Sequence, residues 1–280
     1  MPWIDTNGFA TYYEQQGEGT PLLLIPGRGL DRSSWAPQVA CYAQHFRTIT
    51  YDPRGVGKTR APEGDFDVEQ MADDAAVLLR ALGIAEAHVA GFSLGGMAAI
   101  HMATQGKAKL LSLGLHSTVH RAYAHLRLRQ RLSLRILQLD DAELWAAFSA
   151  YTAFGAEFTN AHPDIVEEEI ERRARRWAAF SEADKEGTRA QIRAAMTHDD
   201  PELLQRIDVP SLVTVGSSDE VTRPEYAQEI AATIANARFV VFPGGPHRTS
   251  TFMAEEFNRV TLDFLLGVES RRRSKPAMSA

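Results

Sequence analysis

The sequence predicts an α/β fold: a mostly parallel, doubly wound sheet that carries an all-helical insertion as a cap. Three observations support this prediction. Short apolar runs alternate with longer segments of helical periodicity, which is typical of a parallel sheet covered by helices. Between about residues 119 and 200 this alternation stops, and only helix-like segments rich in Leu, Ala, Arg and Glu follow. A glycine-flanked serine also stands between a strand-like run and a helix-like run.

The alternating segments define the expected strands and helices. The strands are expected at 9–14, 22–25, 48–51, 88–90, 111–115, 212–215 and 239–242. The helices are expected near 34–44, 68–82, 96–104, 224–234 and 251–266. In the second of these helices, apolar residues recur every three or four positions from Met71 to Leu82, which gives the helix one buried face. Gly83 follows directly and is a good C-terminal stop.

Residues 119–200 are expected to form the helical cap, inserted between the core segments 1–118 and 201–268. Within the cap, 125–139 fits either a strand that alternates or a helix with one apolar stripe. Ile136 is the only β-branched residue of that segment, which favours the helix. An insertion at this point would lie over the carboxyl ends of the strands, where open α/β sheets bind ligands.

Composition narrows the class of protein and of partner. The chain is 44% hydrophobic and 24% charged, an ordinary balance for a folded domain, and its net charge of -6 argues against a nucleic-acid partner. Cys41 is the only cysteine, so no intramolecular disulfide and no cysteine metal cluster are expected. Neither a signal peptide nor a bilayer-spanning apolar stretch is seen, so we expect a cytoplasmic monomer or homodimer without a membrane partner. The basic residues at 271–275 are expected to lie in a disordered tail over 269–280.

Ser93 is the expected catalytic nucleophile. It is the serine of Gly91-Phe92-Ser93-Leu94-Gly95, which has the pattern G-x-S-x-G. In a sharp turn between a strand and a helix, such a serine is strained and its hydroxyl is exposed, and flanking glycines are needed because a Cβ would clash. A glycine-rich turn that only packs a helix close to a sheet would show the same pentapeptide, so the context of strand and helix carries the interpretation.

A serine nucleophile needs a base, and the base needs a carboxylate that orients it. In a sheet of this kind both residues should follow later strands, in the chain order serine, acid, histidine. Asp219 comes shortly after the expected strand 212–215, and His247 comes shortly after 239–242. We therefore expect Asp219 to be the orienting acid and His247 to be the base.

Other histidines offer alternatives. His116 and His120 follow an expected strand and could also approach the site as the base. His198 stands beside Asp199 and Asp200, and all three are residue types that bind metals. Because adjacent positions do not share one helix face, this segment is expected to cap the next helix, and no metal site is predicted.

The negative charge that develops on a substrate oxygen needs hydrogen-bond donors. The backbone N–H of Leu94 is the first expected donor, because it begins the helix after the serine. The loop Pro26-Gly27-Arg28-Gly29 follows an early strand, and its glycines let the backbone turn toward the nucleophile. We expect the main-chain N–H of Arg28 to be the second donor. Its guanidinium could reach a substrate carboxylate, or be solvated or paired within the protein.

These motifs together resemble the α/β-hydrolase superfamily, from about Tyr12 to Leu266. The resemblance rests on Pro26-Gly27-Arg28-Gly29, Tyr51-Asp52-Pro53-Arg54-Gly55-Val56-Gly57, Gly91-Phe92-Ser93-Leu94-Gly95-Gly96, Gly216 with Asp219, and Gly245-Pro246-His247. Within the superfamily the chain is similar to capped esterases, enol-lactonases and cofactor-free haloperoxidases, which implies that no cofactor is used. The resemblance also implies that Asp52 and Arg54 form an internal pair. Pro26 stands where such proteins usually have His, and Pro246 where they usually have Gly, so the substrate stays open.

The expected activity is hydrolysis of a small carboxylic ester, thioester or lactone through an acyl-enzyme on Ser93. Two alternatives remain: a biosynthetic lyase, cyclase or acyltransferase that excludes water, and a ligand receptor whose triad is vestigial. Next to the triad or the strand ends, the expected pocket-lining residues are Phe92, Thr118 and Val221. From the cap, the residues expected either to line the pocket or to form the cap core are Trp145, Tyr151, Phe154 and Trp177.

Overall fold

The computed structural model describes residues 2–60 and 64–274, and in this part of the chain eight strands form one sheet. Their order across the sheet is β1-β2-β4-β3-β5-β6-β7-β8. The strands are β1 (Trp3–Thr6), β2 (Phe9–Gln16), β3 (Pro21–Ile25), β4 (Arg47–Tyr51), β5 (Glu86–Phe92), β6 (Lys109–His116), β7 (Ser211–Gly216) and β8 (Ala237–Phe242). β2 pairs antiparallel with β1 and β4, and all other neighbours pair parallel. The predicted α/β class with a mostly parallel sheet is confirmed.

All seven expected strands are present in the structure, and each is one to four residues longer than predicted. β1 was not expected. It is a short edge strand in which only Thr6 is fully buried, so it lacks the apolar run by which the other strands are detected.

Helices cover both faces of the sheet because the central strands are apolar on both faces. In β3, Leu23 and Ile25 pack with α2 (Val68–Ala81), α3 (Leu94–Thr104) and α8 (Pro224–Thr233). Leu22 and Leu24 point to the other face, with α1 (Ala36–Tyr42) and α10 (Ala254–Ser274). Two short elements, the 3-10 helix η1 (Arg32–Trp35) and α9 (Thr249–Phe252), precede α1 and α10. The five predicted helices are therefore present, the first and the last each in two pieces.

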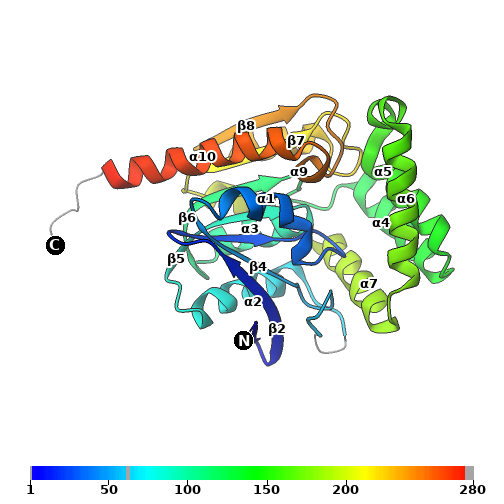
Figure 1. Cartoon of the computed structure of the whole chain (residues 1–280), viewed down its shortest axis with the longest axis horizontal. Helices are drawn as coiled ribbons and strands as arrows, with labels where there is room; N and C mark the ends of the chain where they lie inside the picture. Colours follow the sequence, from blue (N-terminus) through cyan, green and yellow to red (C-terminus); the bar gives the residue numbers. More distant parts are fainter. Residues whose placement is uncertain (1, 61–63, 275–280) are drawn as a thin grey trace.

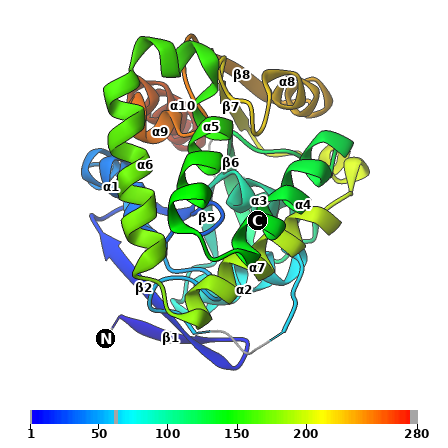
Figure 2. The same ribbon diagram turned by 90° about the vertical axis from the view of Figure 1, so that its right-hand side faces the viewer.

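Between β6 and β7 the chain forms α4 (Ala124–Gln138), α5 (Ala142–Ala161), α6 (Pro163–Ala178) and α7 (Glu182–Thr197), followed by the 3-10 helix η2 (Pro201–Arg206). The ambiguous segment 125–139 is thus helical, as expected. We call α4–α7 the insertion. It lies at one end of the sheet, on the side to which β7 and β8 point, whereas α10 projects from the other end (Figure 1). Figure 2 views the molecule from the side of the insertion.

The insertion touches the sheet loops through a break in α5. Gly155 has a non-helical, left-handed φ of 67°. A Cβ at this position would collide with the carbonyl oxygen of Ser218, in the loop after β7. The break also leaves the carbonyl of Ala153 free of its helical partner, and the backbone N–H of His247 donates to it at 2.8 Å. One glycine therefore lets α5 dock against the loops that follow β7 and β8.

The C-terminal region corrects one prediction. The disordered tail was expected from residue 269, but α10 continues as a helix to Ser274. Arg272 explains the extension, because it donates to Glu86 and to Glu269, each at 2.6 Å. The predicted tail residues 275–280 lie outside the described residues. Within the described residues, no helix is both long and apolar enough to cross a membrane.

Asp52 and Arg54 do not pair with each other, so that expectation is wrong. Asp52 accepts hydrogen bonds from the guanidinium of Arg32 at 3.2 Å and from the backbone N–H of Lys58 at 2.8 Å. Arg54 instead forms an ion pair with Asp74 at 2.6 Å. Both side chains hold together the loop after β4, each with a different internal partner.

Candidate active site

Ser93 lies in the sharp turn between β5 and α3, as the sequence predicts. Its φ of 53° is in the left-handed region, which is unusual for a residue with a side chain. A Cβ at Gly91 would collide with the backbone of Gly95, and a Cβ at Gly95 would collide with the carbonyl oxygen of Ile25. Backbone cannot move aside as a flexible side chain can. Both glycines are therefore required for a turn this tight.

Two neighbours hold the backbone of Ser93 in this conformation. The backbone N–H of Ser93 donates to the carbonyl of His116 at 2.9 Å, and Thr118 Oγ1 donates to the carbonyl of Ser93 at 2.7 Å. Thr118 is buried against α3 and is not among the residues that line the cavity, so its predicted role in lining the pocket is wrong. Its hydroxyl adds a third hydrogen bond to the Ser93 carbonyl, which already accepts from the backbone N–H groups of Gly96 and Met97, so Thr118 fixes the turn from the side of α3.

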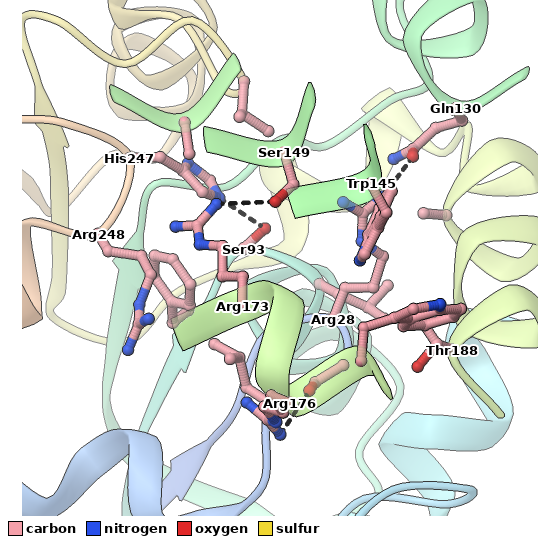
Figure 3. Close-up of a pocket in the computed structure, with 18 of the residues that line it drawn as sticks. Arg28, Ser93, Gln130, Trp145, Ser149, Arg173, Arg176, Thr188, His247 and Arg248 are labelled. Atoms are coloured by element: carbon pink, nitrogen blue, oxygen red, sulfur yellow. Dashed lines mark hydrogen bonds between the residues drawn. The ribbon is translucent and has the colours of Figure 1, made fainter. Parts of the chain in front are cut away.

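The structure brings Asp219 and His247 to Ser93. His247 Nε2 lies 3.2 Å from Ser93 Oγ, and His247 Nδ1 lies 2.8 Å from Asp219 Oδ2. Because β7 and β8 are parallel neighbours, the loops after them leave the sheet at the same edge as the turn after β5. Figure 3 shows the side chains of His247 and Ser93 pointing toward each other.

Asp219 is held by further hydrogen bonds. Its Oδ1 accepts from the backbone N–H groups of Val221 and Thr222 at 2.9 and 2.8 Å, and its Oδ2 accepts from the Thr222 hydroxyl at 2.8 Å. Burial alone would raise the pKa of Asp219, but the nearby His247 and the bonds from Thr222 outweigh it and hold the pKa below its ordinary value. Asp219 is therefore an ionised, fixed acceptor for His247 at neutral pH.

The alternative histidines do not reach Ser93. The ring of His116 is buried, with Nδ1 2.9 Å from Thr214 Oγ1, and burial lowers its pKa to about 3. His120 lies beside Glu229, with 3.4 Å between Nε2 and Oε1. Among the alternatives that the sequence left open, the geometry thus selects His247.

The segment 198–200 has a different environment from the one expected. Asp200 precedes η2, but its side chain makes no capping hydrogen bond. His198 Nδ1 instead lies 3.3 Å from Nε2 of His101, a residue of α3, and Asp200 Oδ2 lies 3.8 Å from the same Nε2. The three groups lie within 4.8 Å of one another, close enough to share a cation. Sequence reasoning missed this arrangement because His101 comes from a distant helix.

The loop 26–29 lies beside the serine turn. Gly27 packs so closely on Phe92 that a Cβ would lie 2.7 Å from its ring. The backbone N–H of Gly29 donates to Gln191 Oε1 of α7 at 2.7 Å, which fixes the far side of the loop. Arg28 and Leu94, the two expected backbone donors, both line one cavity together with Ser93 and His247.

This cavity has a volume of about 160 Å³ and lies between the strand ends and the insertion. Four predicted pocket residues line it: Phe92, Val221, Trp145 and Trp177. Tyr151 does not, because its side chain is 81% exposed on the outer side of α5. Phe154 does not either, since it packs against Phe158 of α5 and Phe252 of α9, where the insertion meets the core.

Most of the polar lining of the cavity was not predicted from the sequence. Five further arginines line the cavity: Arg129, Arg172, Arg173, Arg176 and Arg248. Figure 3 shows Arg173, Arg176 and Arg248 around it. One signal was available for Arg248, which directly follows His247. Residues 172, 173 and 176 share one helix face at a spacing of three and four, but no role in the site was predicted for them from the sequence. Whether these arginines face solvent or the cavity depends on how α6 packs against the rest of the protein.

Comparisons with known proteins agree with this fold. A family model described as "alpha/beta hydrolase fold" matches residues 20–250, and the chain belongs to this family. It is 28% identical to the "Putative carbamate hydrolase RutD" of Azorhizobium caulinodans, over 94% of this chain and 98% of that protein.

Two solved structures are also similar. The enol-lactonase from Burkholderia xenovorans LB400 is 29% identical with a TM-score of 0.79, covering 95% of this chain and 100% of that one. A thermophilic esterase from Thermogutta terrifontis is 27% identical with a TM-score of 0.81, covering 96% and 97%. The fold and these relatives support hydrolase activity for this chain.

Proposed function

We propose that the protein hydrolyses a small carboxylic ester, thioester or lactone through an acyl-enzyme on Ser93. One observation carries this proposal: a single imidazole, His247, lies within hydrogen-bonding distance of both the Ser93 hydroxyl and the Asp219 carboxylate. Ser93 and His247 line a cavity that can hold a small molecule, and Asp219 is buried behind His247. This is the arrangement that activates a serine for attack on a carbonyl.

In the first half of the reaction, Ser93 Oγ attacks the carbonyl carbon of the substrate while His247 Nε2 takes the hydroxyl proton. The negative charge moves to the carbonyl oxygen, where the backbone N–H groups of Leu94 and Arg28 would donate to it. When the tetrahedral intermediate collapses, the bond to the leaving group breaks and His247 gives the proton to the departing oxygen or sulfur. The result is an ester of Ser93.

In the second half, water replaces the leaving group. His247 removes a proton from the water as its oxygen attacks the acyl carbon, and the proton then passes to Ser93 Oγ as the acid departs. Asp219 keeps Nδ1 protonated, so that Nε2 is free to accept in both halves. The hydrogen bonds from Thr222 and Val221 hold Asp219 in this orientation.

The relatives are consistent with this chemistry. Their names include a carbamate hydrolase, an enol-lactonase and an esterase. In all three reactions a nucleophile attacks a carbonyl carbon that carries a heteroatom leaving group, so the same residues could serve each. We further propose that α4–α7 acts as a cap, because α4, α5, α6 and α7 all contribute lining residues to the cavity.

The test compares release of 4-nitrophenol from 4-nitrophenyl acetate by the wild type, Ser93→Ala and the control Ser270→Ala. Ser270 is exposed on α10, so the control should behave as the wild type. We expect steady turnover that falls roughly 10⁴-fold or more in Ser93→Ala. One burst without turnover would instead indicate transfer to another acceptor. Equal background release from the wild type and Ser93→Ala would contradict the proposal.

A further inference from the structure

The cavity at Ser93 is unusually rich in positive charge. Six guanidinium groups line it, those of Arg28, Arg129, Arg172, Arg173, Arg176 and Arg248, and its lining within the described residues includes no carboxylate. Figure 3 labels four of these arginines: Arg28, Arg173, Arg176 and Arg248. They come from the loop after β3, from α4, from α6 and from the loop after β8. The chain as a whole, by contrast, has a net charge of -6.

Four of these arginines have carboxylate partners just outside the cavity. Glu169 accepts from Arg172 at 2.6 Å, from Arg173 at 2.9 Å and from Arg248 at 3.4 Å. Arg176 pairs with Asp31 at 3.2 Å. Two carboxylates thus serve four guanidinium groups, so even the paired part of the cluster keeps a positive balance.

Arg28 and Arg129 have no carboxylate partner within the part of the chain that the structure describes. Arg28 Nη1 donates to the neutral amide oxygen of Gln130 at 2.5 Å, and Arg129 Nη2 donates to the Thr152 hydroxyl at 2.9 Å. The Nε of Arg129 is buried and has no hydrogen-bond partner. The pKa of Arg28 falls to about 10, through burial and then the nearby Arg173. The pKa of Arg129 falls to about 9, mainly through burial and then through the nearby charge of Arg28.

Both groups therefore stay charged at neutral pH although neither forms an ion pair with a carboxylate of the described residues. The charge of Asp219 offsets only part of the effect of burial on the pKa of Arg129. Asp219 is the nearest candidate, but it forms no ion pair with Arg129, and its oxygens already accept from His247, Thr222 and Val221. Burying unpaired charge is costly, and an anionic ligand that supplies the missing partner would offset that cost. Arginine matches a carboxylate in shape as well as charge.

We propose that Arg28 and Arg129 bind a carboxylate of the substrate, so that the enzyme acts on a small ester, thioester or lactone that also carries a free carboxylate group. This inference rests on the proposed hydrolase function and names its substrate class. The paired arginines of α6 add a positive field around the same cavity. A volume of about 160 Å³ limits the substrate to a short chain or a single ring.

The test uses two 4-nitrophenyl esters of equal chain length, the hydrogen adipate, which carries a free carboxylate, and the neutral hexanoate. Adipate is chosen because its chain is too long for the carboxylate to attack its own ester readily. We expect the wild type to prefer the adipate ester by about 10- to 100-fold in kcat/KM, the range for one or two charge-assisted hydrogen bonds. Arg129→Gln and Arg28→Gln should each lower this ratio at least about tenfold. The matched control is Arg131→Gln, an exposed arginine of α4 outside the cavity, which should keep it.

Failure of the carboxylate inference and failure of the hydrolase proposal give different results. Equal kcat/KM for both esters in the wild type would overturn the carboxylate inference and leave the hydrolase proposal intact. If the wild type cleaves neither ester, the hydrolase proposal fails, and calorimetric titration with free adipate then tests the inference alone. Adipate should bind the wild type at least about tenfold more tightly than Arg129→Gln or Arg28→Gln. Equal affinities, no binding, or tighter binding of inorganic phosphate than of adipate would overturn it.

Discussion

Replacing Arg129 by methionine is expected to stabilise the folded protein. The side chain of Arg129 is only 6% exposed, and within the described residues no carboxylate pairs with it. Methionine keeps a long, flexible apolar side chain and removes the charge. Thr152 loses one donor, but its hydroxyl still donates to the carbonyls of Phe148 and Ser149, each at 3.2 Å. The substitution therefore removes an uncompensated charge without leaving a new unsatisfied group.

The size of the effect follows from the pKa of Arg129. Burial lowers the pKa of Arg129 from its ordinary value to about 9, which corresponds to roughly 5 kcal/mol of stability lost by the charged form. Relaxation and water reduce such penalties, and replacing buried charges by apolar groups gains about 1–4 kcal/mol in measured cases. For a chain of this size, each kcal/mol raises Tm by about 2–4 °C. We therefore expect Tm to rise by at least about 3 °C.

The effect also depends on pH in a defined direction. Folding lowers the pKa of this base, so its penalty is complete below about pH 9 and declines as the pH rises from about 9 toward 12.5. Urea unfolding at pH 7 and at about pH 10.5 should show a larger gain in unfolding free energy at pH 7. The control is Arg131→Met. A variant Arg129→Met that is no more stable than this control, or less stable than the wild type, would show that the charge is compensated within the folded protein.

Three further predictions concern the site and its support. Asp219→Asn should lower kcat roughly 10⁴-fold, because it leaves His247 in the wrong tautomer, while Tm measured by calorimetry changes little by comparison. A decrease in kcat of less than tenfold would contradict the orienting role of Asp219. Gly95→Ala should cost about 1–3 kcal/mol or more in urea unfolding, since its Cβ meets the Ile25 carbonyl, and an unchanged stability would refute the close approach. Burial lowers the pKa of His116 to about 3, so the unfolding free energy should decrease as the pH falls from about 6.5 toward 3. His116→Asn should make this decrease smaller, and an identical dependence of the unfolding free energy on pH would exclude His116 as a cause.

The sequence was sufficient to predict the elements that depend on local pattern. Strands β3 to β8 have apolar runs, and the residues after β5, β7 and β8 carry Ser93, Asp219 and His247. Parallel strands bring their carboxyl ends to one edge, so three motifs separated in sequence could be predicted to meet. The edge strand β1 was missed because it has no apolar run.

The charged lining could not be predicted because it depends on docking. Arg172, Arg173 and Arg176 look in sequence like a solvated face, and only the packing of α6 turns them toward the cavity. Thr118 follows β6 as a pocket residue would, yet it is used to satisfy the carbonyl of Ser93. Tertiary contacts between the insertion and the sheet loops decide these positions, and no local periodicity encodes them.

Covalent labelling tests whether Ser93 is an activated nucleophile. The wild type, Ser93→Ala and Ser270→Ala are incubated with a 4-nitrophenyl alkylphosphonate, and the adduct is located by mass spectrometry of the digested protein. The account predicts one phosphonyl group on Ser93 in the wild type and in Ser270→Ala, with release of one 4-nitrophenol, and none in Ser93→Ala. An unlabelled wild type, or equal labelling of Ser93→Ala, would contradict it.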